Sequence, residues 1–243
     1  MRGISLEEMK GIRLMDRIDS KYVISSVFLP ELLEKMASYF RVQVINEKRI
    51  ATYGTQYLDT PNLEMFVMHQ NGKLNRQKIR IRSYIDSNLS FLEIKNKNNK
   101  GRTKKIRVPV GLSQLQSIQE LNGEKQFLEE NAIFSTSDLI PALSNEFDRI
   151  TCVNNACSER ITIDMNLSFL NHLTNENQLL DNLVVLELKQ DGYLHSDFKD
   201  ILNSMRIKRR SFSKYCMGTF LTNTAIKHNR FKSRWAIINK LTQ

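Results

Sequence analysis

The sequence predicts an α+β fold: an antiparallel sheet of about eight strands that can close into a barrel, with helices packed around it. Segments in which apolar and polar residues alternate recur along the chain, and short runs of turn-forming residues separate several of them. Segments with helical spacing stand between the groups of strands. No change in composition and no glycine- or proline-rich linker divides residues 1–243, so we expect a single domain.

The chain opens with two predicted helices. Ser5 followed by Glu8 is typical of a capping box at the start of a helix over residues 5–12. Apolar residues at helical spacing predict a second helix over residues 29–40. Pro30 falls in the first turn of this helix, where its missing N–H costs no hydrogen bond.

Alternation then predicts the strands of the sheet. They cover residues 41–45, a segment through Tyr53 and Tyr57, and residues 74–85, 89–97, 102–110, 146–153, 158–167 and 183–191. Turn residues at 86–88 and 98–101 join three of these strands into a meander, and Asn154 with Asn155 predicts a further hairpin.

Helical spacing predicts the remaining elements. These are a short helical turn at 62–70 closed by Asn71 and Gly72, a mainly helical region over 112–146 with Leu115, Ile118 and Leu121 on one face, helices at 197–202 and 213–226, and a final basic helix at about 227–243.

Cations occupy one face of several predicted strands. Residues two apart in a strand share a face, so Lys78, Arg80 and Arg82 lie opposite Ile79 and Ile81. The same alternation groups Glu93, Lys95 and Lys97; Lys105 and Arg107; Arg149, Arg160, Thr162 and Asp164; and Glu187 with Lys189. For one strand alone, a solvated outer face is the simpler interpretation. If the sheet closes, these faces converge on a cationic interior that needs an oligoanion, and phosphate suits both arginine and lysine.

The net charge of +10 and a pI near 9.5 also predict a polyanionic partner. Nucleic acid, a phosphate-rich ligand and an anionic membrane surface are the candidates. Proteins that bind single strands interleave aromatic residues with cations so that bases can stack, whereas these strands interleave Ile, Leu and Val. We therefore expect no nucleic-acid partner.

Cysteines and hydropathy exclude other classes. Cys152 and Cys157 are close enough to share a zinc ion, but no second pair of ligands follows at a usable spacing. No run approaches the ~18 apolar residues that a membrane span needs, and no apolar stretch opens the chain. We expect a reduced, cytoplasmic location, with peripheral membrane association left open.

Glutamates stand among these cations in two similar stretches, residues 92–95 and 186–189, each Leu-Glu-aliphatic-Lys. Such a glutamate either pairs with a neighbouring cation or binds a divalent metal, and Mg²⁺ or Mn²⁺ suits carboxylate and phosphate oxygens together. Glu93 and Glu187 are both metal candidates. The salt bridge is the favoured role for Glu93.

Six stretches in order resemble the catalytic domains of vacuolar transporter chaperone (VTC) polyphosphate polymerases, which are triphosphate tunnel metalloenzymes of the CYTH-like superfamily. They are RIDSKYVI from Arg17, QYLDTPNLEMFVMHQNGKLNRQKIRIRSY, FLEIKNKNNKGRTKKIRV, EFDRITCVNNACSERITIDMNL, VVLELK and RRSFSKYCMG. The resemblance implies an eight-stranded antiparallel barrel whose basic interior binds a chain of phosphates. It implies transfer of the terminal phosphoryl group of ATP onto inorganic polyphosphate, with release of ADP.

The resemblance also implies roles for individual residues. The residues expected to act on the transferred phosphoryl group are Lys21, Arg80, Arg82, Lys95, Arg149 and Lys214. Together with these, Lys78, Lys105, Arg107, Arg160, Lys189 and Ser213 are expected to bind phosphate, and Glu187 to hold the metal. Phe147 departs from the family, which often has an aromatic hydroxyl there, and this puts one phosphate contact in doubt. The fungal relatives carry membrane spans, so we expect any membrane coupling here to need a membrane-protein partner.

Two other functions stay open at this point. A tunnel-type hydrolase of triphosphates would typically carry Glu-x-Glu pairs that hold metals and activate water. Here Phe91 stands two residues before Glu93, and Val185 two before Glu187, which favours transfer to phosphate over hydrolysis. A module that binds polyphosphate or nucleic acid without catalysis is the second alternative.

Overall fold

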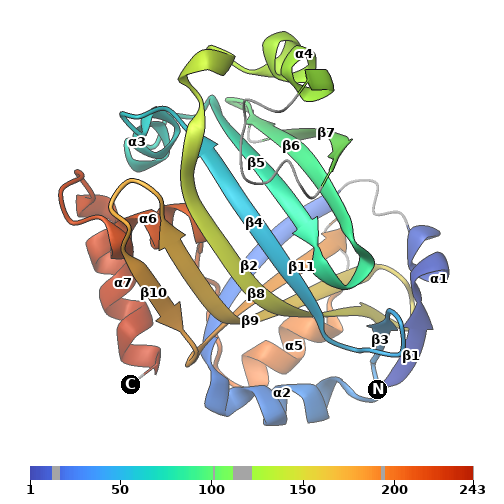
Figure 1. Cartoon of the computed structure of the whole chain (residues 1–243). Coiled ribbons are helices and arrows are strands. Elements are labelled where there is room, and N and C mark those ends of the chain that lie inside the picture. The colour runs from blue at the N-terminus through green and yellow to red at the C-terminus, as the bar shows by residue number, and fades with distance from the viewer. Residues whose placement is uncertain (13–16, 101, 112–121, 193–194, 243) are drawn as a thin grey trace.

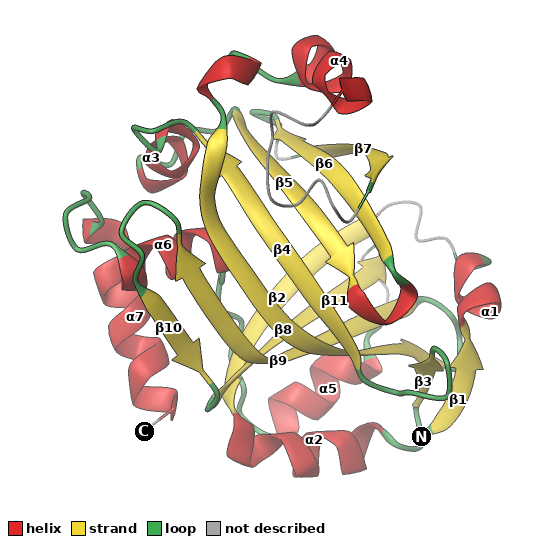
Figure 2. Ribbon diagram, viewed as in Figure 1, coloured by secondary structure: helices red, strands yellow, loops and turns green. Residues whose placement is uncertain are grey.

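The computed structural model describes residues 1–12, 17–100, 102–111, 122–192 and 195–242. They form an α+β structure built on one large, mainly antiparallel sheet, which confirms the predicted fold class (Figures 1 and 2). The strands are β1 (Arg2–Ser5), β2 (Arg17–Ser25), β3 (Phe40–Val44), β4 (Ala51–Asp59), β5 (Arg76–Tyr84), β6 (Leu89–Lys97), β7 (Thr103–Val110), β8 (Ile140–Asn154), β9 (Glu159–Asn171), β10 (Asn177–Leu180) and β11 (Leu183–Asp191). The helices are α1 (Leu6–Lys10), α2 (Leu29–Met36), α3 (Glu64–Gln70), α4 (Asn122–Asn131), α5 (Asp197–Ser204), α6 (Lys214–Thr222) and α7 (Asn229–Thr242).

Eight strands form the main path of the sheet, in the order β2-β11-β9-β8-β4-β5-β6-β7. The sheet curves so that β4 to β7 lie across the molecule from β2, β11 and β9 (Figure 1). Strands β2 and β7 are the two ends of this path, and no hydrogen-bonded pairing joins them within the described chain. The predicted barrel is therefore a tunnel-like sheet with an open seam.

In β5 and β6, apolar and charged side chains lie on opposite faces of the sheet, as their alternation in the sequence predicts. Ile79, Ile81, Leu92 and Ile94 are buried in an apolar cluster that also contains Leu128 of α4. Lys78, Arg80 and Arg82 point to the opposite face, inside the curved sheet. The apolar outer faces of these strands thus supply the core, while the inner faces are left for charge.

A second apolar cluster covers the outer side of β9 and β11. Leu186 and Leu188 of β11 pack there with Phe198 of α5 and with Leu32 and Met36 of α2. Figure 1 shows α2 and α5 side by side below these strands. Helices α2 and α5 therefore cover the outer side of these strands, whereas α6 packs at the inner side, where Tyr215 stacks on Tyr57 of β4.

The helix starts follow local chemistry. At α1, the Glu8 backbone N–H donates to Ser5 Oγ at 3.2 Å and the Ser5 N–H donates to Glu8 Oε2 at 2.8 Å, which confirms the capping box. Helix α2 ends at Met36, earlier than predicted, because Phe40 already begins β3 and is buried.

The prediction of a mainly helical region over 112–146 is wrong at its C-terminal end. Helix α4 ends at Asn131, and residues 140–154 are one long strand, β8. Pro141 is its second residue, where the pairing with β4 shifts register between Tyr57 and Leu58, so the missing N–H is tolerated there. The predicted apolar face of Leu115, Ile118 and Leu121 lies outside the described residues.

Strands β1, β2 and β10 lack a clear alternation and have no counterpart in the sequence-based prediction. Strand β2 is one of the eight strands of the main path, because it pairs with β11 over nine residue positions. Strand β3, which covers most of 41–45, lies off this path. The final helix is confirmed as α7, and it is more than a solvated helix because Phe231 and Ile238 are buried in the core.

We expect Ile81→Asp to lower the free energy of unfolding by about 4 kcal/mol or more, because it buries an unpaired carboxylate in the apolar cluster. Ile81→Val should cost only about 1 kcal/mol and serves as the control. Urea denaturation of both variants measures the difference. An Ile81→Asp protein with a normal midpoint would show that this strand face is not the buried one.

Candidate anion-binding tunnel

The inner face of the sheet lines a cavity of about 1160 Å³. All fourteen side chains that the sequence analysis selects lie on its wall: Lys21, Lys78, Arg80, Arg82, Glu93, Lys95, Lys105, Arg107, Arg149, Arg160, Glu187, Lys189, Ser213 and Lys214. They come from β2, β5, β6, β7, β8, β9 and β11 and from the start of α6. The fold thus brings together residues up to 193 positions apart, and their chemical roles stay predictions.

The charge of the protein is concentrated on this wall. Sixteen lysine and arginine side chains but only four carboxylates line the cavity. The whole chain has 36 lysines and arginines against 26 aspartates and glutamates. Among the described residues outside the cavity, acidic side chains slightly outnumber basic ones, so the net positive charge of the described chain belongs to the interior.

Like charges face each other across β5, β6 and β7. Lys78 lies opposite Lys95, which in turn lies opposite Lys105, while Arg80 lies opposite Glu93. Like charges directly opposite one another in a sheet are destabilising. The apolar outer faces of these strands must offset that repulsion, and an anion in the cavity would relieve it.

Glu93 is one of two carboxylates that hold the cations in place. Its Oε2 accepts from Arg80 at 2.6 and 2.9 Å, and its Oε1 accepts from Lys105 at 2.7 Å. Burial would raise the pKa of this carboxyl, but Arg80 and Lys105 outweigh burial and hold the pKa at about 2. Both oxygens are engaged, which is the salt-bridge role that the sequence favours for Glu93.

Asp164 of β9 is the second such carboxylate. Arg149 of β8 donates to its two oxygens at 2.5 and 2.8 Å, and Lys214 at the start of α6 also donates to it. Burial opposes the charge, yet Arg149 and Lys214 keep the pKa of Asp164 well below its usual range. Asp164 therefore fixes two predicted phosphate ligands that come from different elements.

Aromatic faces support the same cations. The rings of Tyr53 and Phe147 stack with their centroids 5.5 Å apart. The Arg149 guanidinium lies 4.9 Å from the Tyr53 centroid, and the Lys214 ammonium lies 4.1 Å from the Phe147 centroid. Such contacts stabilise a cation without neutralising it. At Phe147, where the family often has a hydroxyl, this protein thus offers a ring face to Lys214.

Arg82 and Lys95 have no carboxylate or hydrogen-bond partner among the described residues. Burial and then the positive charge of Arg80 lower the pKa of Lys95 to about 6. Burial and then the positive charges of Arg80 and Arg149 lower the pKa of Arg82 to about 10. A bound anion would supply the counterion that these two side chains lack in the described chain, where Arg82 has only the ring faces of Tyr53 and Phe147, 5.8 and 5.6 Å away.

The turn before α6 places two further ligands. Ser213 caps α6, with its Oγ accepting from the Cys216 N–H at 3.4 Å, and the same Oγ accepts from Lys78 Nζ at 2.9 Å. Lys21 Nζ donates to the carbonyl of Phe212 at 3.0 Å. The N-terminal end of a helix favours negative charge, so these groups and the helix point to the same kind of ligand.

Three further predicted phosphate ligands are also engaged by neighbours. Arg160 donates to the carbonyls of Met9 and Ile12 at 3.2 Å, Arg107 lies 4.3 Å from the centroid of Phe91, and Lys189 lies 3.5 Å from Glu187. They lie on the cavity wall, but each would have to leave or share a contact to bind phosphate.

Glu187 is the lining glutamate best placed for a metal. Its only close ion pair among the described residues is the 3.5 Å contact with Lys189, whereas Glu93 is held at both oxygens. Burial would raise the pKa of Glu187, but Lys189, Lys21 and Arg149 keep it well below its usual value. No group of three or more His, Cys, Asp or Glu side chains gathers in the described chain. Mg²⁺ typically binds through one or two carboxylates plus substrate phosphates, so this donor set fits if phosphate completes it.

Some lining residues were not selected from the sequence. The alternation of β4 could have indicated Tyr53 and Tyr57, and that of β5 could have indicated Arg76. For His69 of α3 and Arg234 of α7 no sequence signal exists, because only the packing of those helices brings them to the cavity.

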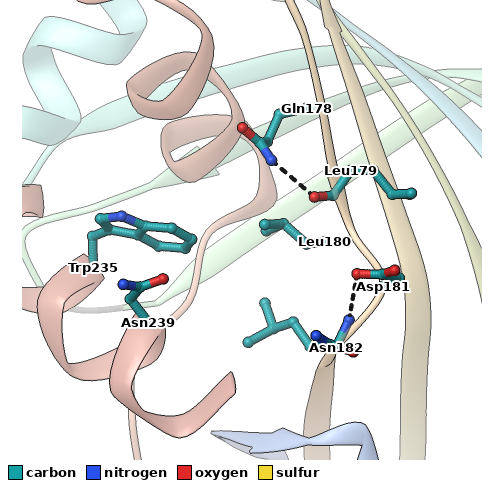
Figure 3. Close-up of a pocket in the computed structure, with 8 residues that line it drawn as sticks. Gln178, Leu179, Leu180, Asp181, Asn182, Trp235 and Asn239 are labelled. Atoms are coloured by element: carbon teal, nitrogen blue, oxygen red, sulfur yellow. Dashed lines mark hydrogen bonds between the residues drawn. The ribbon is translucent and has the colours of Figure 1, made fainter. Parts of the chain in front are cut away.

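A second hollow of about 210 Å³ lies between β10 and α7 (Figure 3). Trp235 and Asn239 face it from the helix, and residues 178–183 line it from the strand and the turn that follows. None of its described lining residues is a cation.

We expect the unliganded protein to become more stable as the pH rises from 7 to 8.5. The pKa of Lys95 is lowered to about 6 and that of Lys214 to about 7, mainly by burial, whereas both lysines titrate near ~10.4 in the unfolded chain. In this window the unfolded state binds more protons, so stability increases with pH. Lys95→Met should reduce the slope of melting temperature against pH, and Lys104→Met, at an exposed lysine on the outer face of β7, should not. An unchanged slope in Lys95→Met would contradict this assignment.

Comparison with known proteins agrees with this architecture. Residues 16–223 match the family model described as the VTC domain. A structure of a proposed adenylate cyclase from Bacillus halodurans has a TM-score of 0.51 at 14% identity, covering 82% of this chain and 96% of that one. A proposed adenylyl cyclase from Hippeastrum with a dominant triphosphatase activity has a TM-score of 0.52 at 11% identity, covering 87% and 99%. At these identities both show the fold alone.

A search of curated proteins finds no significant match. No helix of the described chain is long and apolar enough to cross a membrane. The family match extends over most of the sequence, from just before β2 to just after α6, and includes every strand of the main path. The chain belongs to the VTC domain family.

Proposed function

We propose that this protein is an ATP-dependent polyphosphate polymerase, which transfers the terminal phosphoryl group of ATP onto a growing inorganic polyphosphate chain. The observation that carries the proposal is the cavity wall, with sixteen cations and four carboxylates. Membership of the VTC domain family supports it. A small anion would leave much of this charge uncompensated, whereas a chain of phosphates extends along it.

Phosphoryl transfer requires little covalent catalysis by the protein. The transferred group passes through a loose transition state with negative charge on its oxygens, so positioning and charge stabilisation supply most of the catalysis. Arg149 and Lys214 are held rigidly by Asp164, and Arg80 by Glu93. These fixed cations can orient phosphate oxygens without reorganising during the reaction.

The unpaired cations then act on the substrate itself. Arg82 and Lys95 are partly desolvated and have no carboxylate partner in the described chain, so a bound phosphate is their natural counterion. A phosphate beside Lys95 would raise the pKa of its amine, which is about 6 without a ligand, and so favour protonation to the ammonium. A divalent metal at Glu187, Mg²⁺ or Mn²⁺, would neutralise charge on the phosphate oxygens.

Hydrolysis of triphosphates is the second candidate. The Hippeastrum protein has a triphosphatase activity, but its similarity to this chain is one of fold. Paired carboxylates that hold metals for water activation are missing from β6 and β11, where Phe91 and Val185 precede Glu93 and Glu187. Asp164 is committed to Arg149 and Lys214. These features favour phosphate over water as the acceptor.

Binding of nucleic acid on an outer surface is disfavoured. The cation excess lies inside the curved sheet, and the rest of the chain has slightly more acidic than basic residues. A duplex could not enter a cavity of about 1160 Å³.

Products formed from ATP decide between the two enzymatic functions. With ATP and Mn²⁺ or Mg²⁺, we expect ADP and a ladder of phosphate chains on a gel. Arg82→Ala should abolish the ladder and remain folded, because it removes a cation that has no partner carboxylate. Lys104→Ala on the outer face is the matched control and should be active. Free phosphate without chains would mean that the protein is a hydrolase.

Glu187→Gln tests the proposed metal ligand. It keeps the size of the side chain but removes its charge, so we expect phosphoryl transfer to fall by ~10² or more. Binding of tripolyphosphate without metal should survive, because an anion has left a cationic wall. Titrations of turnover against metal and calorimetric binding of tripolyphosphate measure the two effects. Normal turnover with normal metal dependence would exclude Glu187 as the ligand.

A further inference from the structure

One end of the cavity is completed by a helix outside the family match. The match ends at residue 223, and α7 begins at Asn229. Arg234 of α7 nevertheless lines the cavity, together with Arg76 and Lys97, which lie opposite each other at the ends of β5 and β6. We call these three residues the α7-end cluster.

Packing of α7 fixes the position of Arg234. Phe231, one turn earlier, is only 2% exposed, and its ring lies 5.7 Å from that of Phe66 and 6.3 Å from that of His69, both on α3. The Arg234 guanidinium lies 5.7 Å from the Phe231 ring. The arginine is thus carried by an anchored helix turn and not by a loose tail.

The α7-end cluster has no compensating carboxylate nearby on the sheet. On β6, Glu93 pairs with Arg80, and the next positions toward this end are Lys95, opposite Lys78, and Lys97, opposite Arg76. The four lining carboxylates lie on β2, β6, β9 and β11, and none lies on α3 or α7.

His69 of α3 lies close to these cations, and its pKa is affected by their positive charge. Burial and the surrounding charges of Lys78, Arg76, Arg234 and Lys97 lower its pKa to about 2. The imidazole is therefore neutral, and its Nδ1 lies 3.1 Å from Cys216 Sγ. These four cations and His69 line the same cavity.

The opposite end of the cavity has a different character. Leu6 and Met9 of α1, with Ile45 and Leu89, line it. Arg160 on that side is engaged by the carbonyls of Met9 and Ile12. The cations without a lining carboxylate nearby therefore lie on the side of the Arg80–Glu93 pair that faces α7.

We propose that Arg76, Lys97 and Arg234 form a second anion subsite, which binds the distal part of a long inorganic polyphosphate where it passes out of the cavity. From Arg80 to Arg76 the strand advances about 13 Å, so a triphosphate held at Arg80 and Arg82 would not extend along the whole path. This inference rests on the proposed function, since it requires phosphate binding in the cavity.

Arg234→Ala tests the subsite against Lys232→Ala, an exposed cation on the same helix that does not line the cavity. Dissociation constants are measured by calorimetry for tripolyphosphate and for inorganic polyphosphate of tens of units, over a series of salt concentrations. Removing one cation that contacts a flexible polyanion should weaken long-chain binding about three- to tenfold and reduce the log–log salt slope by about 0.7. Tripolyphosphate affinity should be unchanged, and Lys232→Ala should behave as the wild type with both ligands.

The outcomes separate the subsite from the function itself. If the wild type fails to bind tripolyphosphate, the proposed function fails. If tripolyphosphate binds normally but Arg234→Ala does not weaken the long chain, the subsite is refuted alone. The subsite is also refuted if Lys232→Ala weakens long-chain binding as much as Arg234→Ala does. The same holds if Arg234→Ala weakens tripolyphosphate binding as much as long-chain binding. Either result would mean that the loss of any positive charge has this effect.

Discussion

Repulsion among the cations of the cavity is the constraint on which the arrangement of this molecule depends. Strands β5, β6 and β7 bring lysines directly opposite lysines. The cost is offset on the other side of the same strands, where Ile79, Ile81 and their neighbours are buried. Two kinds of contact inside the cavity stabilise its cations. Two carboxylates each pair with two cations, and aromatic faces contact cations without neutralising them.

Two of the four lining carboxylates position cations, and Glu187 is the one that we propose as a metal ligand. Glu93 and Asp164 each engage an arginine and a lysine, so their negative charge is used to position ligands. Glu187 has one longer contact, with Lys189. A metal at Glu187 would take phosphate oxygens as further ligands, and Val185 stands where β11 would need a second carboxylate two residues before it. This arrangement is the physical reason to favour phosphate as acceptor.

Concentration of charge inside the sheet also has consequences for selectivity. Because the rest of the chain is nearly balanced, attraction for a polyanion is strongest at the openings of the cavity. The two ends differ, with apolar residues of α1 at one and the α7-end cluster at the other. A linear phosphate chain is the ligand shape that can use such a wall over its full length.

The sequence by itself determined the α+β class, the meander of β5 to β7, and which side chains face inward, because a period of two assigns every residue of a strand to a face. All fourteen selected side chains accordingly line one cavity. Tertiary structure alone decided which partners they meet. Asp164 reaches Lys214, 50 residues away, because the sheet places β9 beside β8 and α6 packs on both. Pairing and packing between distant segments likewise decided three further features, for which local spacing carries no signal. They are the strand through Pro141, the position of β2 in the sheet and the position of Arg234 on the cavity wall.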